Sequence, residues 1–176
     1  GGVLVNGYAE GLAISNNVIA HNVGVYGGGI RVGLNGAQGP VDGENDNISI
    51  HHNSITQNAG IDGPGGVAIY TGTDGYSIEE NLICGNHTGA SGAGIGHVGL
   101  SQGGLIKGNT IILNEAWHGT SAASGGGIQV AGMAPIVAGN PNNAPMTDGS
   151  GDLKIVGNVI QSNSAGTGDG AGINLK

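Results

Sequence analysis

The sequence predicts an all-β solenoid, in which the chain winds into stacked coils of short strands. The first observation behind this prediction is a frame, apolar-x-Ile-x-x-Asn-x-Ile-x-x-Asn, that occurs five times. Its copies span residues 12–22, 48–58, 76–86, 104–114 and 153–163. In the third and fourth copies, the equivalent Asn81 and Asn109 are 28 residues apart. Such self-similarity is typical of solenoids, because each repeat forms one layer that packs against the next.

The second observation is a motif, small-small-Ile-x-apolar, that alternates with the frame. The chain opens on a version of it at Gly2–Val5, and the later copies are Gly28–Val32, Val67–Thr71, Ala93–Ile95, Gly126–Val130 and Ala171–Leu175. Within each run the apolar residues alternate with period two, which indicates strands. Three short strands per turn, stacked in parallel with equivalent positions in register, predict a parallel β-helix of about five coils.

The third observation is that Asn recurs at equivalent corners of this repeat. Stacked Asn side chains can form a ladder in which each amide bonds to the next, and Asn tolerates the left-handed backbone that tight corners need. The sequence therefore predicts a structural ladder of Asn17, Asn53, Asn81, Asn109 and Asn158.

Composition narrows the function classes. The 176 residues form a single domain over residues 1–176, with 40 Gly, no Phe and a net charge of −8. Only four residues are Lys or Arg, so phosphate backbones and anionic membrane surfaces are not expected partners. No apolar run approaches the length of a membrane span, so membrane insertion is not expected.

The Asn-x-Ile-x-x-Asn and Gly-Gly-Ile signatures make the chain similar to the right-handed parallel β-helix family, the pectate-lyase-like superfamily. In style it most resembles the repeats of bacterial surface and periplasmic proteins. The resemblance implies right-handed coils, which the general preference for right-handed crossovers also favours. It further implies an extracellular or cell-surface location, with the periplasm as the alternative. Because the chain begins at Gly1, we expect it to be a segment of, or processed from, a longer protein.

One group of polar residues follows the first Ile of each frame. In the stacked register His51, Glu79 and Lys107 should be neighbours on the surface, with His52 and Glu80 in the next column. Two His and two Glu in adjacent layers could bind a transition metal or act as acid and base. The same residues also describe a charge-matched exposed face.

A second group lies at the ends of the two longest loops. Asp42, Glu44 and Asp46 in one loop, and Asp148 and Asp152 in the other, place oxygen atoms at alternate positions. Several carboxylates suit a hard cation, which makes calcium the cofactor to consider. The alternative is ordinary Asp-Gly turn chemistry.

A third group could contact a polysaccharide. We expect Arg31, Tyr70, Gln129 and Asn174 to point outward from the glycine-led strands. Trp117, in the inserted loop Glu115–Ser124, is a further candidate, and its alternative role is that of a loop anchor. These side chains can hydrogen-bond to and stack on a sugar chain, although the strand residues also describe an ordinary solvated strand.

The sequence contains no convincing catalytic set, because Arg31 is the only Arg and no pair of carboxylates is placed to face another across a cleft. We therefore predict a structural, adhesive or self-assembling (filament-forming) role. The alternative is a carbohydrate-active module, either glycan-binding or a truncated polysaccharide lyase or glycoside hydrolase. Because the first and last strands carry the same motif, we expect either head-to-tail stacking of copies or flanking coils that cover both ends.

Overall fold

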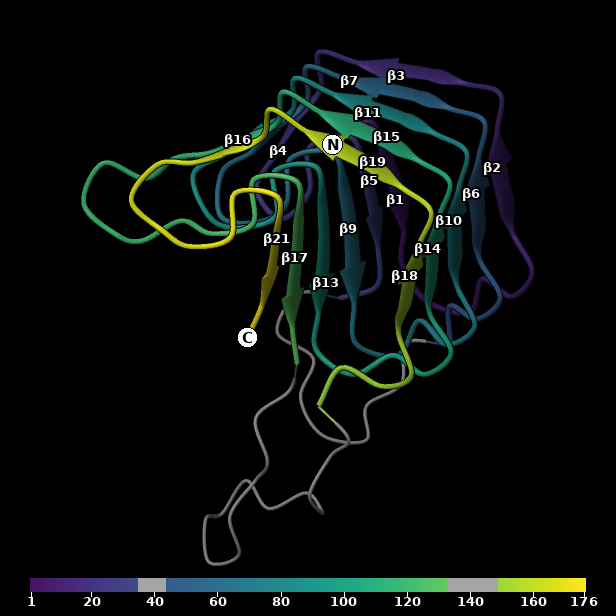
Figure 1. Cartoon of the computed structure of the whole chain (residues 1–176). Helices are drawn as coiled ribbons and strands as arrows, with labels where there is room; N and C mark the ends of the chain where they lie inside the picture. The colour runs from purple at the N-terminus through teal and green to yellow at the C-terminus, as the bar shows by residue number, and fades with distance from the viewer. Residues whose placement is uncertain (35–43, 133–148) are drawn as a thin grey trace, which may run out of the picture.

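The computed structural model describes residues 1–34, 44–132 and 149–176, and within these ranges it contains 21 strands. Every strand pairs in parallel with the equivalent strand of the neighbouring coil. Figure 1 looks along the resulting solenoid, so that successive coils appear one behind the other. The predicted all-β parallel β-helix is confirmed.

Four sheets form the wall of the solenoid, one strand of each per coil. Sheet 1 contains β1 (Val3–Val5), β5 (Ile30–Val32), β9 (Val67–Tyr70), β13 (Ile95–Val98), β17 (Ile128–Ala131) and β21 (Ile173–Leu175). Sheet 2 contains β2 (Ala13–Ser15), β6 (Ser49–His51), β10 (Ser77–Glu79), β14 (Leu105–Lys107) and β18 (Lys154–Val156).

The second half of each frame supplies the other two sheets. Sheet 3 contains β3 (Val18–Ala20), β7 (Ser54–Thr56), β11 (Leu82–Cys84), β15 (Thr110–Ile112) and β19 (Val159–Gln161). Sheet 4 contains β4 (Val23–Gly24), β8 (Ala59–Gly60), β12 (His87–Thr88), β16 (Glu115–Ala116) and β20 (Ser164–Ala165). The three predicted strands per coil are present, and a fourth strand of two residues follows the second Asn of the frame.

The core consists of isoleucine columns. Each three-residue strand of sheets 2 and 3 turns one Ile inward, as Ile78 and Ile83 do in the third coil, and both are fully buried. Full burial of such a side chain contributes roughly 1.5–3 kcal/mol relative to exposure. Because each layer contributes the same small set of side chains at one strand spacing, the core can be filled without Phe.

The predicted Asn ladder is confirmed, and a second one runs parallel to it. At every step the backbone N–H and the Nδ2 amide of one Asn donate to the Oδ1 of the equivalent Asn in the following coil, at 2.9–3.0 Å. The Nδ2 of Asn81 also donates to the carbonyl of Ile50 in the preceding coil at 2.9 Å. The second ladder contains Asn22, Asn58, Asn86, Asn114 and Asn163.

The left-handed residue of each corner differs from the prediction. It is the residue before the ladder Asn, such as His52 with φ 55° and Glu80 with φ 54°, while the Asn itself keeps ordinary backbone angles. Gly108 and Gly157 occupy this position in the next two coils. The side-chain amide is thus what the ladder Asn contributes, and the residue before it adopts the left-handed conformation that turns the corner.

Candidate functional site

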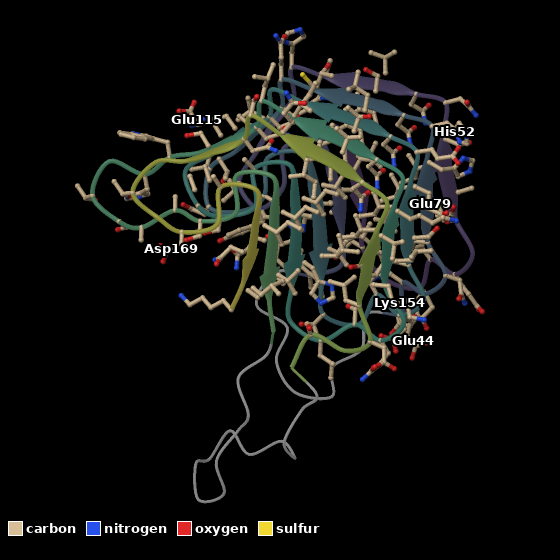
Figure 2. The ribbon with its side chains drawn as sticks, in the orientation of Figure 1. Glu44, His52, Glu79, Glu115, Lys154 and Asp169 are labelled. Carbon is tan, nitrogen blue, oxygen red and sulfur yellow. The ribbon has the colours of Figure 1, made fainter. Side chains whose placement is uncertain are left out.

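The His–Glu corner lies on the outer side of sheet 2, where Figure 2 labels His52 and Glu79. Strand pairing places Glu79 between His51 and Lys107. Lys107 Nζ lies 3.8 Å from Glu79 Oε2, and His52 Nε2 lies 2.7 Å from Glu80 Oε2. The side chains of His52, Glu80 and Lys107 are more than half exposed and that of Glu79 is 33% exposed, and surface pairs of this kind contribute about 0–1 kcal/mol.

These side chains do not converge on a common point. His51 Nδ1 and His52 Nδ1 are 3.0 Å apart, but the Nε2 of His52 faces Glu80 instead. Within the described residues, no three His, Cys, Asp or Glu side chains are grouped so that they could hold a metal ion. The geometry is that of two separate side-chain pairs, Lys107–Glu79 and His52–Glu80, on the outside of the coil.

Of the proposed calcium ligands, Asp42 and Asp148 lie outside the described residues. Asp46 Oδ1 accepts the backbone N–H of Asp74 at 3.0 Å, and Asp74 Oδ1 accepts that of Gln102 at 2.7 Å. Asp46 therefore belongs to a third, shorter ladder that caps the turns between sheets 1 and 2. Glu44 (φ 50°) and Asp152 lie exposed in the loops beside it.

Sequence reasoning missed this third ladder, although the spacing was a usable signal. Asp46 to Asp74, and Asp74 to Gln102, are both steps of 28 residues. That is the same spacing as between the ladder residues Asn81 and Asn109.

Two members of the expected sugar-binding face, Tyr70 and Gln129, are buried. Tyr70 was expected beside Arg31, but the residue paired with Arg31 is Ala68, because β9 has four residues and Val67 aligns with Ile30. Tyr70 is 3% exposed, and its hydroxyl donates to the Tyr26 carbonyl at 2.8 Å. Gln129 is also 3% exposed.

Glycine-rich loops explain this burial, because they fold over the outer side of sheet 1. A Cβ on Gly27 would meet the side chains of Arg31 and Ala68, and one on Gly92 would meet Gly96 and Gln129. The loops therefore approach the sheet more closely than a side chain would permit. The outward-facing positions of sheet 1 therefore form a contact between these loops and the sheet.

Arg31 serves this loop-to-sheet contact. Its guanidinium lies 5.7 Å from the ring centroid of Tyr26 and 5.5 Å from that of Tyr70, and its Nε donates to the Gly33 carbonyl. Burial raises the pKa of Tyr70 to about 12, against the opposing effect of the Arg31 charge. The arrangement ties the loop before β5 to the sheet through a cation–π contact.

Three members of the proposed sugar-binding set are not buried: Trp117, Asn174 and Arg31, the last of which is partly exposed. Asn174 is partly exposed and donates from Nδ2 to Gln129 Oε1 at 2.9 Å. Trp117 is 50% exposed, and its ring covers Gly166, where an added Cβ would clash with the indole. The loops after β16 and β20, which project furthest at the left of Figure 1, are joined here through Trp117.

A buried polar pair lies inside the solenoid and was not expected from the sequence. The Tyr76 hydroxyl is 2.8 Å from His97 Nδ1, and His97 Nε2 is 3.0 Å from the Gly99 carbonyl. A carbonyl can only accept, so Nε2 carries the proton and Nδ1 accepts from the tyrosine. Burial lowers the pKa of His97, which keeps the ring neutral. Gly104 in the next coil leaves room for the Tyr76 ring.

The end strands of sheet 1 each have an open edge. In a parallel sheet, alternate residues bond to the two opposite neighbours. Val3 and Val5 bond to the β5 coil, so the N–H and carbonyl of Leu4 face away from it. Gly172 and Lys176 bond to β17, so those of Ile173 and Leu175 face away. Within the described residues, β1 pairs only with β5 and β21 only with β17.

The fold and these edges define the chain as a parallel β-helix repeat protein. No protein-family model matches the chain, and neither a curated protein nor a solved structure matches it. The structure contains no helix, within the ranges it describes, that is long and apolar enough to cross a membrane.

Proposed function

We propose that this chain is a structural module of an extracellular or cell surface, a rigid β-helical scaffold that is extended by further β-helix layers at its ends. The observation that carries the proposal is the pair of open edges in sheet 1. They belong to strands of the same motif, Gly-Val-Leu-Val at one end and Gly-Ile-Asn-Leu at the other. Another copy, or flanking coils of a longer chain, would supply the added layer.

The interior supports the same proposal, because it is repetitive along the stack. The Ile columns and both Asn ladders run through all five frames, so flanking coils that complete the layer begun by β21 would continue contacts that already exist. A second copy paired on β21 would extend sheet 1 alone, because sheets 2 to 4 end one layer earlier. Backbone groups at an open edge are a template for further strand pairing. The net charge of −8 opposes lateral clumping and leaves growth along the axis as the favoured direction.

A carbohydrate-active role has less support. Tyr70 and Gln129 are buried, and the partly exposed Arg31 is engaged with Tyr26 and Tyr70. This leaves Trp117 and Asn174, which lie on different elements. Neither is accompanied by a pair of facing carboxylates in the described residues. We therefore place the structural role first.

The test is the assembly state of the purified chain. We expect light scattering to rise with protein concentration and electron microscopy to show unbranched filaments. Deletion of residues 173–176 should abolish filaments while far-UV circular dichroism of the central coils is retained. A chain that scatters as a monomer at every concentration would contradict self-stacking.

A further inference from the structure

The corner after β6 brings two imidazole rings of adjacent residues together. His51 is the last residue of β6, and His52 is the corner residue before the ladder residue Asn53. In a regular strand, successive side chains point to opposite faces. The left-handed backbone of His52 (φ 55°) interrupts this alternation, so both rings lie on the outside of the coil, where Figure 2 labels His52.

The two rings meet through their Nδ1 atoms, which are 3.0 Å apart, with the ring planes inclined at 86°. A metal ion at about 2.0–2.1 Å from each nitrogen would make an N–metal–N angle of about 95° at this separation. That angle is close to the value of about 90° in square-planar and tetragonal sites, which are typical of Cu²⁺ and Ni²⁺. The pair of nitrogens therefore has the spacing of two neighbouring ligands of one ion.

Glu80 fixes the tautomer of the His52 ring. His52 Nε2 lies 2.7 Å from Glu80 Oε2. The carboxylate accepts, so Nε2 carries the hydrogen, and Nδ1 of the neutral ring has a free lone pair. Metal-binding His residues commonly donate their other ring N–H to a carboxylate, which orients the ring and makes the ligating nitrogen more basic. Glu80 has this relation to His52, so it acts as a positioning residue.

His51 completes the pair by a change of tautomer. Without a metal ion, its Nδ1–H donates to the lone pair on Nδ1 of His52, at 3.0 Å. When a metal ion occupies the position between the two nitrogens, that hydrogen leaves Nδ1 and a hydrogen from solvent binds Nε2. The ring stays neutral, and both Nδ1 lone pairs then face the ion.

The charges beside the two rings favour a cation. Glu79 is the register partner of His51 in the following coil, and Glu80 is bonded to His52. Lys107 lies one coil further on and offsets part of this negative charge, with Nζ 3.8 Å from Glu79 Oε2.

We propose that His51 and His52 form a surface site for a divalent transition-metal ion, preferentially Cu²⁺, which the two Nδ1 atoms bind. Imidazole is a ligand for copper, nickel and zinc, and Cu²⁺ has the highest affinity of the divalent first-row ions. Water fills the remaining coordination positions. The site lies on sheet 2 and is independent of whether copies of the chain assemble.

The test is a titration of the full chain with Cu²⁺ alone, followed by isothermal titration calorimetry and electron paramagnetic resonance. His51→Asn and His52→Asn each remove one imidazole, and Asn tolerates the left-handed corner. His87→Asn is the matched control. His87 Nδ1 also faces a carboxylate, 3.6 Å from Glu115 Oε2, but its register partners are Ala59 and Glu115 and include no second His.

We expect the unmodified chain and His87→Asn to bind Cu²⁺ at a saturable site, with a spectrum that shows two coordinated imidazole nitrogens. His51→Asn and His52→Asn should each lose one of these nitrogens and most of the affinity. Glu80→Gln should keep both nitrogens and lower the affinity by about 10–100-fold. The urea midpoint of Glu80→Gln without metal should equal that of the unmodified chain, which separates the effect on the site from an effect on the fold.

Cu²⁺ binding that is unchanged in both His51→Asn and His52→Asn would overturn the proposal, because other donors would then hold the ion. The absence of saturable binding by the unmodified chain would overturn it as well. Tighter binding of Zn²⁺ than of Cu²⁺ in a parallel titration would overturn the preference for copper. An affinity that Glu80→Gln leaves unchanged would overturn the positioning role of Glu80.

Discussion

At the scale of single residues, the ladder amides combine two functions in one side chain. The Oδ1 of Asn81 accepts two hydrogen bonds from Asn53, while its Nδ2 reaches Asn109 and the carbonyls of Ile50 and Glu79. An aliphatic side chain at this position would leave donors and acceptors in both neighbouring coils without partners. Burial away from water makes that loss costly.

Asn81→Ala should therefore lower the free energy of unfolding by about 1–3 kcal/mol, measured by urea denaturation. Asn17→Ala is the matched control. Asn17 is exposed and lies at the end of the ladder, so its removal leaves only the coil on one side without partners. An equal decrease in the free energy of unfolding for the two variants would show that hydrogen bonding to both neighbouring coils stabilises the fold no more than bonding to one.

His97 is the residue that should make stability depend on pH. Burial lowers its pKa from the ordinary value of 6.5, so the folded protein disfavours the protonated ring. The unfolded chain takes up a proton below about pH 6.5, and stability contributed by the neutral ring is lost as the pH falls through that range.

We expect the urea midpoint to fall between pH 7 and pH 5, and to fall less in the double variant His97→Val, Tyr76→Phe. The double change removes the histidine and the hydroxyl that bonds to it together, so that neither is left unpaired. His118→Asn, on an exposed loop, is the control and should keep the dependence of the unmodified chain. An unchanged pH profile in the double variant would assign the dependence to other groups.

At the scale of elements, the repeated frame predicts the strands because its Ile and Asn positions each have a distinct structural role. Ile at alternate positions fills a layer, and Asn joins layers. Tyr70 was misplaced because Val67 and Ile69 are both acceptable inward residues, so the pattern alone leaves the register of β9 ambiguous by two positions. The burial of Gln129 was also unpredictable, because it depends on a loop folding back from another part of the coil.

The corner residues have a left-handed backbone conformation, which is strained for any residue other than Gly. Leu113 has φ 57° and is exposed, whereas Gly85 occupies the equivalent corner of the preceding coil. For an L-residue the left-handed region costs roughly 1–2 kcal/mol relative to the ordinary backbone. Gly meets no such penalty.

Leu113→Gly should therefore raise the free energy of unfolding by up to about 1 kcal/mol, the strain relief being partly offset by the greater freedom of Gly in the unfolded chain. Thermal denaturation followed by circular dichroism measures the change. Leu113→Ala is the control, because alanine keeps the Cβ that causes the strain. A stabilisation by alanine equal to that by glycine would point to removal of exposed apolar surface as the cause.

At the scale of the whole molecule, the net negative charge opposes association of copies, whereas the open edges of sheet 1 favour it. The chain carries a net charge of −8, so two copies repel before their end strands meet. Raising the ionic strength from about 0.1 M to about 1 M shortens the screening length from about 10 Å to about 3 Å. The hydrogen bonds of the junction are short-range and are less affected.

Added salt should therefore lower the protein concentration at which light scattering rises, since repulsion between copies is screened. The measurement is a scattering series over protein concentration at several concentrations of sodium chloride. The chain lacking residues 173–176 is the control and should remain monomeric throughout. If scattering falls as salt is added, attraction between charges and not the open edges would drive assembly.

The corner residue that precedes each ladder Asn forms a surface column in which the residue type differs from coil to coil. Asn16, His52, Glu80, Gly108 and Gly157 occupy one such column. The side chains of Asn16, His52 and Glu80 are exposed, and Gly108 and Gly157 have none, so this column differs from coil to coil while the Ile and Asn columns stay the same. Substitutions in this column would therefore change the surface charge at one position per coil, about 4.8 Å apart, and would leave the Ile core and the Asn ladders unchanged.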